Sequence, residues 1–186
     1  MNLPDTDPIF KMIPERIAHR PLHAVELGSQ SGFFAQRFLK NVHDSILWCV
    51  DPWDLSLQKN LPEGVGTKPE TFKKWKENVK PWHGTRCHDI HGKSWDVAKE
   101  FNEEIDFLYI DGDHRFWALL ADLRDWVPKV RSGGLVCGHD WTSKHWKNEV
   151  QKAVRVWLEN DAPSGIEIKK GIVTKSKTEC FWFYLP

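Results

Sequence analysis

Short apolar runs alternate along most of the chain with stretches in which apolar residues recur every three or four positions. The runs are nearly continuous, as in strands that are buried on both faces, and a turn signal follows each one. The strands predicted in this way are His23–Leu27, Ile46–Val50, Arg86–Ile90, Ile105–Ile110 and Leu135–Gly138. The helical spacing predicts helices over Gly32–Lys40, Phe116–Val127 and Val150–Leu158.

This order of elements predicts an α/β fold, a Rossmann-like, doubly wound and mostly parallel sheet with right-handed crossovers. Two late runs, Ile166–Ile168 and Cys180–Leu185, predict an antiparallel pair that ends the sheet in an antiparallel edge strand. The length of 186 residues suits one domain over 1–186.

Two segments lie outside the alternation. Residues 1–21 contain apolar positions that predict a short helix over the core, and they are too few for a large N-terminal cap. Residues 55–82 form a long insert with turn signals and then a predicted helix, Glu70–Val79. Because this insert follows a strand end, we expect it to be a lid over a site.

The composition excludes several classes of function. The 26 basic and 26 acidic side chains balance, so a general nucleic-acid-binding protein is not expected. No apolar run reaches the ~18 residues of a membrane helix, and the first residues do not read as a secretory signal. The four cysteines are far apart in apolar runs, which predicts reduced core thiols in a cytoplasmic protein.

Tryptophan is unusually frequent, with 11 residues. Aromatic rings bury a large area at low entropic cost, so those in polar surroundings are candidates for a ligand cleft or an interface. Partly buried packing is the plainer interpretation for each one. The candidates are Trp53, Trp75, Trp82, Trp141 and Trp146.

The predicted strands end in polar or small residues. These are Gly28, Asp51, Asp89, Asp111 and Asp140. In an open α/β sheet, ligands bind outside the carboxyl ends of the strands. We therefore expect the functional site at this edge of the sheet.

The first turn, with Gly28 and Gly32, suits a loop that approaches a ligand and begins a helix whose N-terminus offers free N–H groups. Gln30 replaces the second glycine of a dinucleotide motif, and Phe33 replaces the lysine of a phosphate-binding loop. The remaining interpretation is a site for S-adenosylmethionine (SAM), whose amino acid part carries a carboxylate and an amine. Asp51 ends the next strand, where a carboxylate accepts both ribose hydroxyls.

Further residues are predicted cofactor contacts. Glu26 shapes the site from below the methionine part. Ser29 and Phe33 belong to the same turn, and Asp111 borders the cofactor from the fourth strand. Asp89 and Ser94 would lie beside the adenine ring, although a turn and a helix cap explain them equally well.

The chemical end of the site is expected where the fourth and fifth strands end, around Asp111, His114, His139 and Asp140. Carboxylates suit a hard divalent ion such as Mg²⁺. Such an ion lowers the pKa of a bound hydroxyl and orients it, while a nearby base takes the proton. Asp113 is more simply explained as the cap of the following helix.

The stretches VELGSQSGFF, VDPW, IDFLYIDGDHRF and WVPKVRSGGLVCGHDW resemble class I SAM-dependent methyltransferases over roughly residues 22–160. Within this class the chain resembles the macrocin- and mycinamicin-type sugar O-methyltransferases, and more distantly catechol O-methyltransferases. The resemblance implies that Asp111 and Asp140 are metal ligands and that His114 is the catalytic base. The relatives have an acid where this chain has His139, which leaves open a Mn²⁺ or Fe²⁺ ligand, a base, or a site without metal.

The expected function is methyl transfer from SAM to a hydroxyl of a small molecule, sugar- or catechol-like, assisted by a divalent metal held by Asp111, His139 and Asp140. Neither a nucleic acid nor a membrane is an expected partner. A homo-oligomer would complete a site that lacks a large cap. Two alternatives remain: a metal-independent methyltransferase for another acceptor, and a non-catalytic SAM-binding or interaction module.

Overall fold

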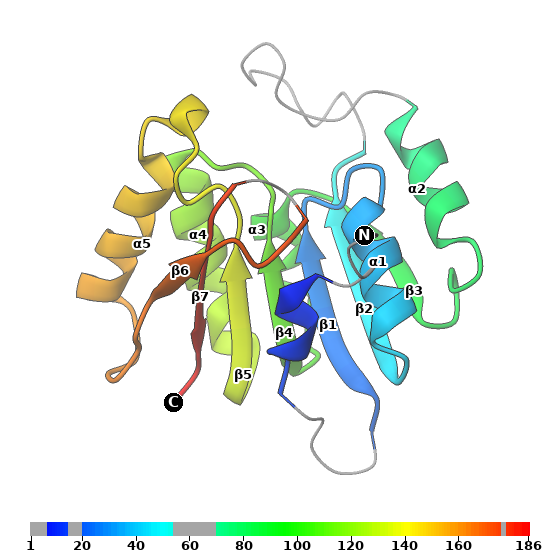
Figure 1. Ribbon diagram of the computed structural model, residues 1–186, viewed down its shortest axis with the longest axis horizontal. Helices are drawn as coiled ribbons and strands as arrows, with labels where there is room; N and C mark the ends of the chain where they lie inside the picture. The colour runs from blue at the N-terminus through cyan, green and yellow to red at the C-terminus, as the bar shows by residue number, and fades with distance from the viewer. Residues whose placement is uncertain (1–6, 15–19, 54–69, 176–177) are drawn as a thin grey trace, which may run out of the picture.

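A computed structural model describes residues 7–14, 20–53, 70–175 and 178–186 (Figure 1). Its centre is a 7-stranded sheet in the order β3-β2-β1-β4-β5-β7-β6. The strands in that order are β3 (Cys87–His91), β2 (Ser45–Asp51), β1 (Leu22–Leu27), β4 (Ile105–Ile110), β5 (Val130–Gly138), β7 (Cys180–Tyr184) and β6 (Lys169–Gly171). The strands from β3 to β5 are parallel, and β7 runs antiparallel to both of its neighbours. The predicted fold class is confirmed.

Helices cover both faces of the sheet (Figure 1). The helices are η1 (Pro8–Lys11), α1 (Phe33–Asn41), α2 (Thr71–Val79), α3 (Ser94–Val97), α4 (Phe116–Trp126), η3 (Val127–Lys129), η4 (Lys144–Trp146) and α5 (Glu149–Asn160). One apolar core joins η1, α1 and α2 to one face, and a second joins α4 and α5 to the other. The buried strands therefore read as continuous apolar runs because each face has its own core.

Two predicted strands have different bounds. The strand expected at Ile166–Ile168 is instead β6, Lys169–Gly171, a short edge strand with polar side chains. The fifth strand, expected at Leu135–Gly138, begins earlier, at Val130, and β5 continues through an irregularity in its pairing with β4, so Gly133 and Gly134 lie within it. Gly133 has φ +73°, which glycine adopts without a steric cost.

The N-terminal segment and the insert are described only in part. Ile9 and Phe10 of η1 are buried, as the predicted short helix over the core requires. The predicted helix of the insert is α2, while residues 55–69 of the predicted lid lie outside the described residues. All four cysteines are buried and free, as predicted.

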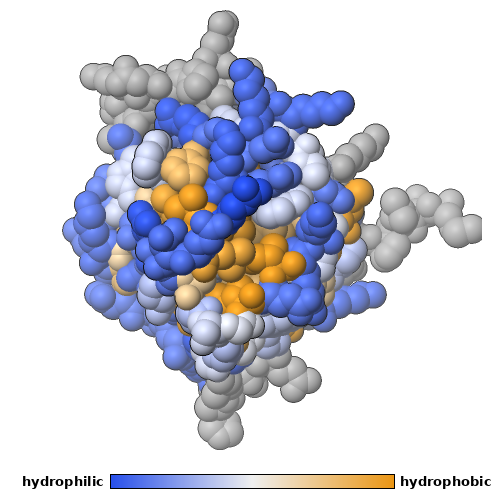
Figure 2. All heavy atoms as spheres, turned by 90° about the vertical axis from the view of Figure 1, so that its left-hand side faces the viewer, coloured by the Kyte–Doolittle hydropathy of each residue, from blue (hydrophilic) through white to orange (hydrophobic). Residues whose placement is uncertain are grey.

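The β6 end of the sheet has a mixed surface. Figure 2 shows apolar side chains gathered on this side of the molecule, crossed and bordered by hydrophilic ones. Two apolar residues near this end, Leu158 and Ile172, are exposed. Among the described residues, no helix is long and apolar enough to cross a membrane.

Candidate active site

A cavity of about 650 Å³ opens at the carboxyl ends of the parallel strands. Its size is within the range of small-molecule sites. Residues from all the predicted strand ends except that of β3 line it, among them Gly28, Asp51, Asp111 and Asp140. The site therefore lies at the edge of the sheet where the sequence placed it.

The glycine turn is held tightly between two neighbours. Gly28 has φ +87°, and a Cβ atom there would lie 2.3 Å from the backbone oxygen of Asp111. Gly32 has φ +74°, and its Cβ would lie 2.8 Å from the ring of Trp75 in α2. Any side chain at either position would displace backbone or a buried ring, so both glycines are sterically required.

Asp51 fixes the same turn from the end of β2. Its carboxylate accepts hydrogen bonds from the backbone N–H of Gln30, at 2.9 Å, and of Trp53, at 2.9 Å. Burial raises the pKa of Asp51, while these two hydrogen bonds oppose that shift. Each carboxylate oxygen receives one of these bonds and has a second lone pair for a ligand hydroxyl.

Glu26 and Ser29 form the floor of the cavity. The Ser29 hydroxyl donates to Glu26 Oε2 at 2.5 Å, and both residues are buried. Burial raises the pKa of Glu26 to about 7, and the charge of Asp111 adds to the shift. The floor therefore carries less negative charge at neutral pH than its carboxyl count suggests. Phe33, by contrast, is 62% exposed at the cavity rim.

Of the two residues predicted to lie beside the adenine ring, only one lines the cavity. Ser94 begins α3 and lines the cavity, but its hydroxyl donates to the buried Asp122. Asp89 lies outside the cavity lining, and its carboxylate is 2.7 Å from His83 Nε2 and 2.9 Å from His91 Nε2. Trp95, which the sequence analysis did not select, lines the cavity next to Ser94.

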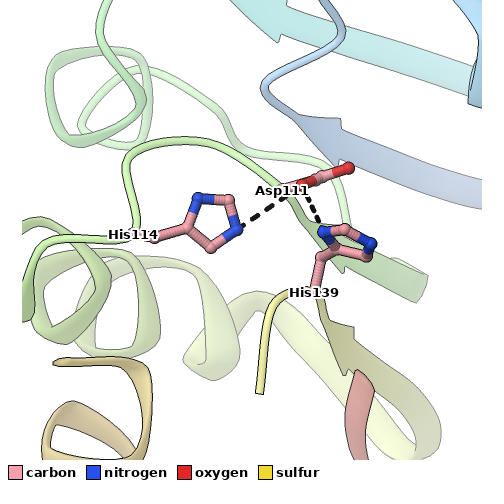
Figure 3. A group of neighbouring side chains, drawn as sticks. All are labelled: Asp111, His114 and His139. Atoms are coloured by element: carbon pink, nitrogen blue, oxygen red, sulfur yellow. Dashed lines mark ion pairs between the residues drawn. The ribbon is translucent and has the colours of Figure 1, made fainter. Parts of the chain in front are cut away.

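At the other end, the structure brings together the four residues predicted for the chemistry, and Figure 3 shows three of them, Asp111, His114 and His139. His139 Nδ1 lies 3.2 Å from Asp111 Oδ1 and 3.1 Å from Asp140 Oδ1. His114 Nε2 lies 3.5 Å from Asp111 Oδ1 and 3.8 Å from Asp140 Oδ2. Figure 3 shows both imidazoles directed at the Asp111 carboxylate, one from the loop after β4 and one from the end of β5.

These groups polarise one another. Burial disfavours ionisation of His139, but the two carboxylates outweigh it and raise its pKa to about 10. Burial likewise acts against the charged form of Asp140, but the facing imidazoles lower its pKa to about 2. The same imidazoles lower the pKa of Asp111 despite its burial. Without a bound cation, His139 is therefore an imidazolium between two carboxylates at neutral pH.

Neighbouring side chains orient this cluster. Trp146 donates its indole N–H to Asp140 Oδ2 at 2.9 Å, and its ring stacks on that of His114. The Thr178 hydroxyl lies 2.7 Å from His139 Nε2. Trp146 was among the predicted cleft tryptophans; Thr178 was missed, because it is remote in sequence and belongs to no motif. Asp113 accepts the backbone N–H of Arg115, the residue before α4, so it shapes the turn into the helix rather than capping the helix's own N–H groups.

Asp111, His114 and His139 each place one ligand atom within 4.8 Å of the others. Two imidazoles and one carboxylate are a donor set for a transition metal such as Mn²⁺ or Fe²⁺ more than for Mg²⁺, which prefers oxygen. Asp140 lies beside the set through its contact with His139. The donors thus fit a divalent cation. The predicted set was Asp111, His139 and Asp140, and in the structure His114 takes the place of Asp140.

The comparisons with known proteins agree with this geometry. The family model of a methyltransferase domain matches residues 25–141. A curated relative, the uncharacterized protein R132 of Acanthamoeba polyphaga mimivirus, is 27% identical over 107 residues. That match covers 52% of this chain and 48% of the relative, so it spans about half the length of each.

Solved structures share the fold at low identity. A putative rRNA methylase from Clostridium thermocellum superimposes with a TM-score of 0.67 at 10% identity, covering 95% of this chain and 92% of that one. The O-methyltransferase of Bacillus cereus in complex with S-adenosylhomocysteine (SAH) gives 0.62 at 12%, covering 95% and 86%. The O-methyltransferase NovP gives 0.62 at 16%, covering 97% and 76%. The chain belongs to the methyltransferase domain family and shares the fold of these solved structures.

Proposed function

We propose that the chain transfers a methyl group from SAM to a hydroxyl of a small molecule bound at the ends of β4 and β5. The observation that carries the proposal is the convergence of Asp111, His114, His139 and Asp140 in the wall of the cavity that contains the glycine turn. A hydroxyl is a poor nucleophile at neutral pH, and a cluster of acids with an imidazole is what its activation needs.

The described residues fit SAM. Asp51 has lone pairs for the two ribose hydroxyls, and the turn that begins at Gly28 lines the cavity. Helix α1 begins at Phe33, so its first N–H groups can bind the methionine carboxylate. When bound, SAM supplies an electrophilic methyl group on a sulfonium.

His114 is the proposed base. Its Nε2 atom makes no hydrogen bond to any described residue, and its ring lies against Trp146 at the cavity wall. This nitrogen is buried, so the acceptor's hydroxyl would reach it from the cavity that His114 lines and give up its proton there. Asp111 and Asp140 face the same nitrogen and stabilise the imidazolium that forms. The stacked Trp146 holds the ring in place.

Asp111 and His139, with Asp140 or His114 completing the set, would hold a divalent cation, which would lower the pKa of the acceptor hydroxyl. The donor set supports Mn²⁺ or Fe²⁺ ahead of Mg²⁺. His114 cannot be at once a ligand through Nε2 and the base through that atom. The substitution His114→Ala separates the roles: loss of metal affinity marks a ligand, whereas lost turnover with unchanged metal affinity marks the base.

A second candidate, metal-independent transfer, is favoured by one observation. The His139 imidazolium already lies between Asp111 and Asp140, where it neutralises the charge that a cation would meet. In this case the positive charge of His139 polarises the acceptor oxygen. His139 then replaces the ion rather than binding it.

The test is methyl transfer from SAM to catechol and to a neutral sugar, followed by mass spectrometry, with added Mn²⁺, added Mg²⁺ or a chelator. Product in any of these arms supports the hydroxyl acceptor. Activity that the chelator abolishes and Mn²⁺ restores supports the metal, whereas activity that the chelator leaves unchanged supports the imidazolium. SAH binding by calorimetry without product from any hydroxyl compound would contradict the proposal.

A further inference from the structure

Arg37, on the second turn of α1, is the one arginine that lines the cavity without being used in the proposed chemistry or paired within the cavity's own loops. Its Nε atom donates to Asp7 Oδ2 at 2.8 Å, and its Nη1 atom donates to the backbone oxygen of Phe33 at 3.0 Å. Within the described residues its Nη2 atom has no partner. The guanidinium thus retains donors on a side chain that is 23% exposed.

Asp7 holds this guanidinium from a buried position. Its side chain is 0% exposed, and its second oxygen accepts the backbone N–H of Lys175 at 2.6 Å. One carboxylate therefore connects the segment before η1, helix α1 and the connection between β6 and β7. An arginine whose role was only to neutralise Asp7 would be expected to donate two hydrogen bonds to its carboxylate. Arg37 donates only one, from Nε.

The cavity that Arg37 lines also has uncharged and aromatic lining residues. Phe33 is exposed at the rim, and the rings of Phe34 and Tyr109 stack with centroids 3.8 Å apart. Thr174 lines the same wall. The acids of the site, Asp111 and Asp140, come from the ends of β4 and β5 and are paired with His139. A cation beside flat apolar rings suits a planar molecule that carries an anionic group.

Resting on the proposed function, we infer that the acceptor is a hydroxylated compound that bears a carboxylate, and that Arg37 binds this carboxylate. Arg37 is then a specificity-determining residue, and Asp7 is the positioning residue that orients it. The arginine fork matches a carboxylate in a planar, bidentate arrangement. The hydroxyl to be methylated lies at the other end of the same molecule, toward His114.

The test compares two probes that differ only in the carboxylate, 3,4-dihydroxybenzoate and catechol, titrated calorimetrically into the SAH-bound protein. A hydrogen bond to a charged group contributes ~1.5–3 kcal/mol, so the carboxylated probe should bind about 10- to 100-fold more tightly. Arg37→Gln should reduce this ratio to about one while the affinities for SAH and catechol stay unchanged. Arg124→Gln is the matched control, because Arg124, on α4, pairs with Asp161 and lies outside the cavity.

Arg37→Gln leaves the buried Asp7 without its cation, so the double variant Asp7→Asn with Arg37→Gln serves if the single variant does not fold. Three results would overturn the inference. They are a ratio near one in the wild type, no binding of the carboxylated probe, or an Arg37→Gln variant that loses SAH affinity while the ratio of the two probe affinities is unchanged. The last would assign Arg37 to the cofactor carboxylate. The proposed function fails separately, if wild-type protein binds SAH but methylates neither probe nor the neutral sugar.

Discussion

Two aspartates at opposite ends of β4 have opposite surroundings. Asp106, at its start, is 0% exposed and is held by Arg20 Nη1 at 2.7 Å, by Arg131 and by the backbone N–H of His23 at 2.7 Å. Asp111, just after its end, faces the imidazoles of His139 at 3.2 Å and His114 at 3.5 Å. One acid is paired with cations that never lose their charge, and the other with groups that exchange protons and ligands.

The pKa of both aspartates is lowered against the effect of burial, but by different partners. For Asp106 the opposing groups are the His23 N–H and the two arginines, and for Asp111 they are the two histidines. A charge with permanent partners stabilises a fold, whereas a charge with exchangeable partners can take part in a reaction. The contrast separates a structural end of the sheet from a chemical end.

The largest expected effect is at the chemical end. His114→Ala should lower kcat by about 10²–10⁴-fold, because the base that takes the acceptor proton is lost. SAH affinity should stay within twofold, since the cofactor turn lies at β1 and β2. Steady-state kinetics and calorimetry on the same sample measure both. His43→Ala, at an exposed histidine outside the cavity, is the control, and full turnover in His114→Ala would exclude the base assignment.

The second prediction concerns stability at the structural end. Asp106→Asn should lower the free energy of unfolding by about 3–5 kcal/mol, because it leaves Arg20 and the nearly buried Arg131 without their partner carboxylate. Asp111→Asn should lower it by less, since His139 keeps Asp140 as a partner carboxylate. Urea unfolding at neutral pH measures both. Equal losses in the two variants would remove the distinction.

A third buried acid sharpens the contrast, because it forms no ion pair with any described residue. Asp122 accepts a hydrogen bond from Ser94, and burial raises its pKa from 3.8 to about 7. The folded state therefore keeps a proton that the unfolded state loses as the pH rises through about 4, and stability falls between about pH 4 and 7. Asp122→Asn should remove up to about 4 kcal/mol of this loss. Urea unfolding at pH 4.5 and 8 measures the free energy of unfolding of both proteins. An equal change with pH in the two proteins would show that Asp122 is ionised in the folded state and would contradict the prediction.

The smallest expected effect is on orientation at the chemical end. Thr178→Val removes the hydroxyl beside His139 Nε2 and should weaken Mn²⁺ binding by about 10- to 100-fold if a metal is held there. Thr178→Ser keeps the hydroxyl and should bind like the wild type. Calorimetric titration with Mn²⁺ compares them, and identical affinities for valine and serine would show that this contact does not orient a ligand.

Much of this arrangement follows from the sequence. The bounds of β4 were predicted to the residue, because a fully buried strand between turn signals leaves little freedom, and the acids at the strand ends meet because parallel strands end at one edge. The sequence could not show that Asp89 pairs with His83 and His91 outside the cavity, or that Ser94 is directed at Asp122. Both depend on side-chain partners from other elements.

The pair of Arg37 and Asp7 was missed for a similar reason. The two residues are 30 positions apart, and neither belongs to a motif. The short strand β6 was displaced because its residues, Lys169–Gly171, have no apolar pattern, and only pairing with β7 makes them a strand. Local patterns therefore predicted the elements and the strand ends, while contacts between distant segments decided which polar side chains enter the cavity.

The central claim is that Asp106, at the start of β4, stabilises the fold, whereas Asp111, after its end, takes part in the reaction. The rate of methyl transfer per folded molecule tests this claim most directly. The rate is measured with SAM and the better of catechol and 3,4-dihydroxybenzoate for Asp111→Asn and Asp106→Asn, each normalised to its folded fraction. The account predicts a loss of at least about 100-fold for Asp111→Asn and a rate near the wild type for Asp106→Asn. A near-normal rate for Asp111→Asn, or an equal loss in both variants, would contradict it.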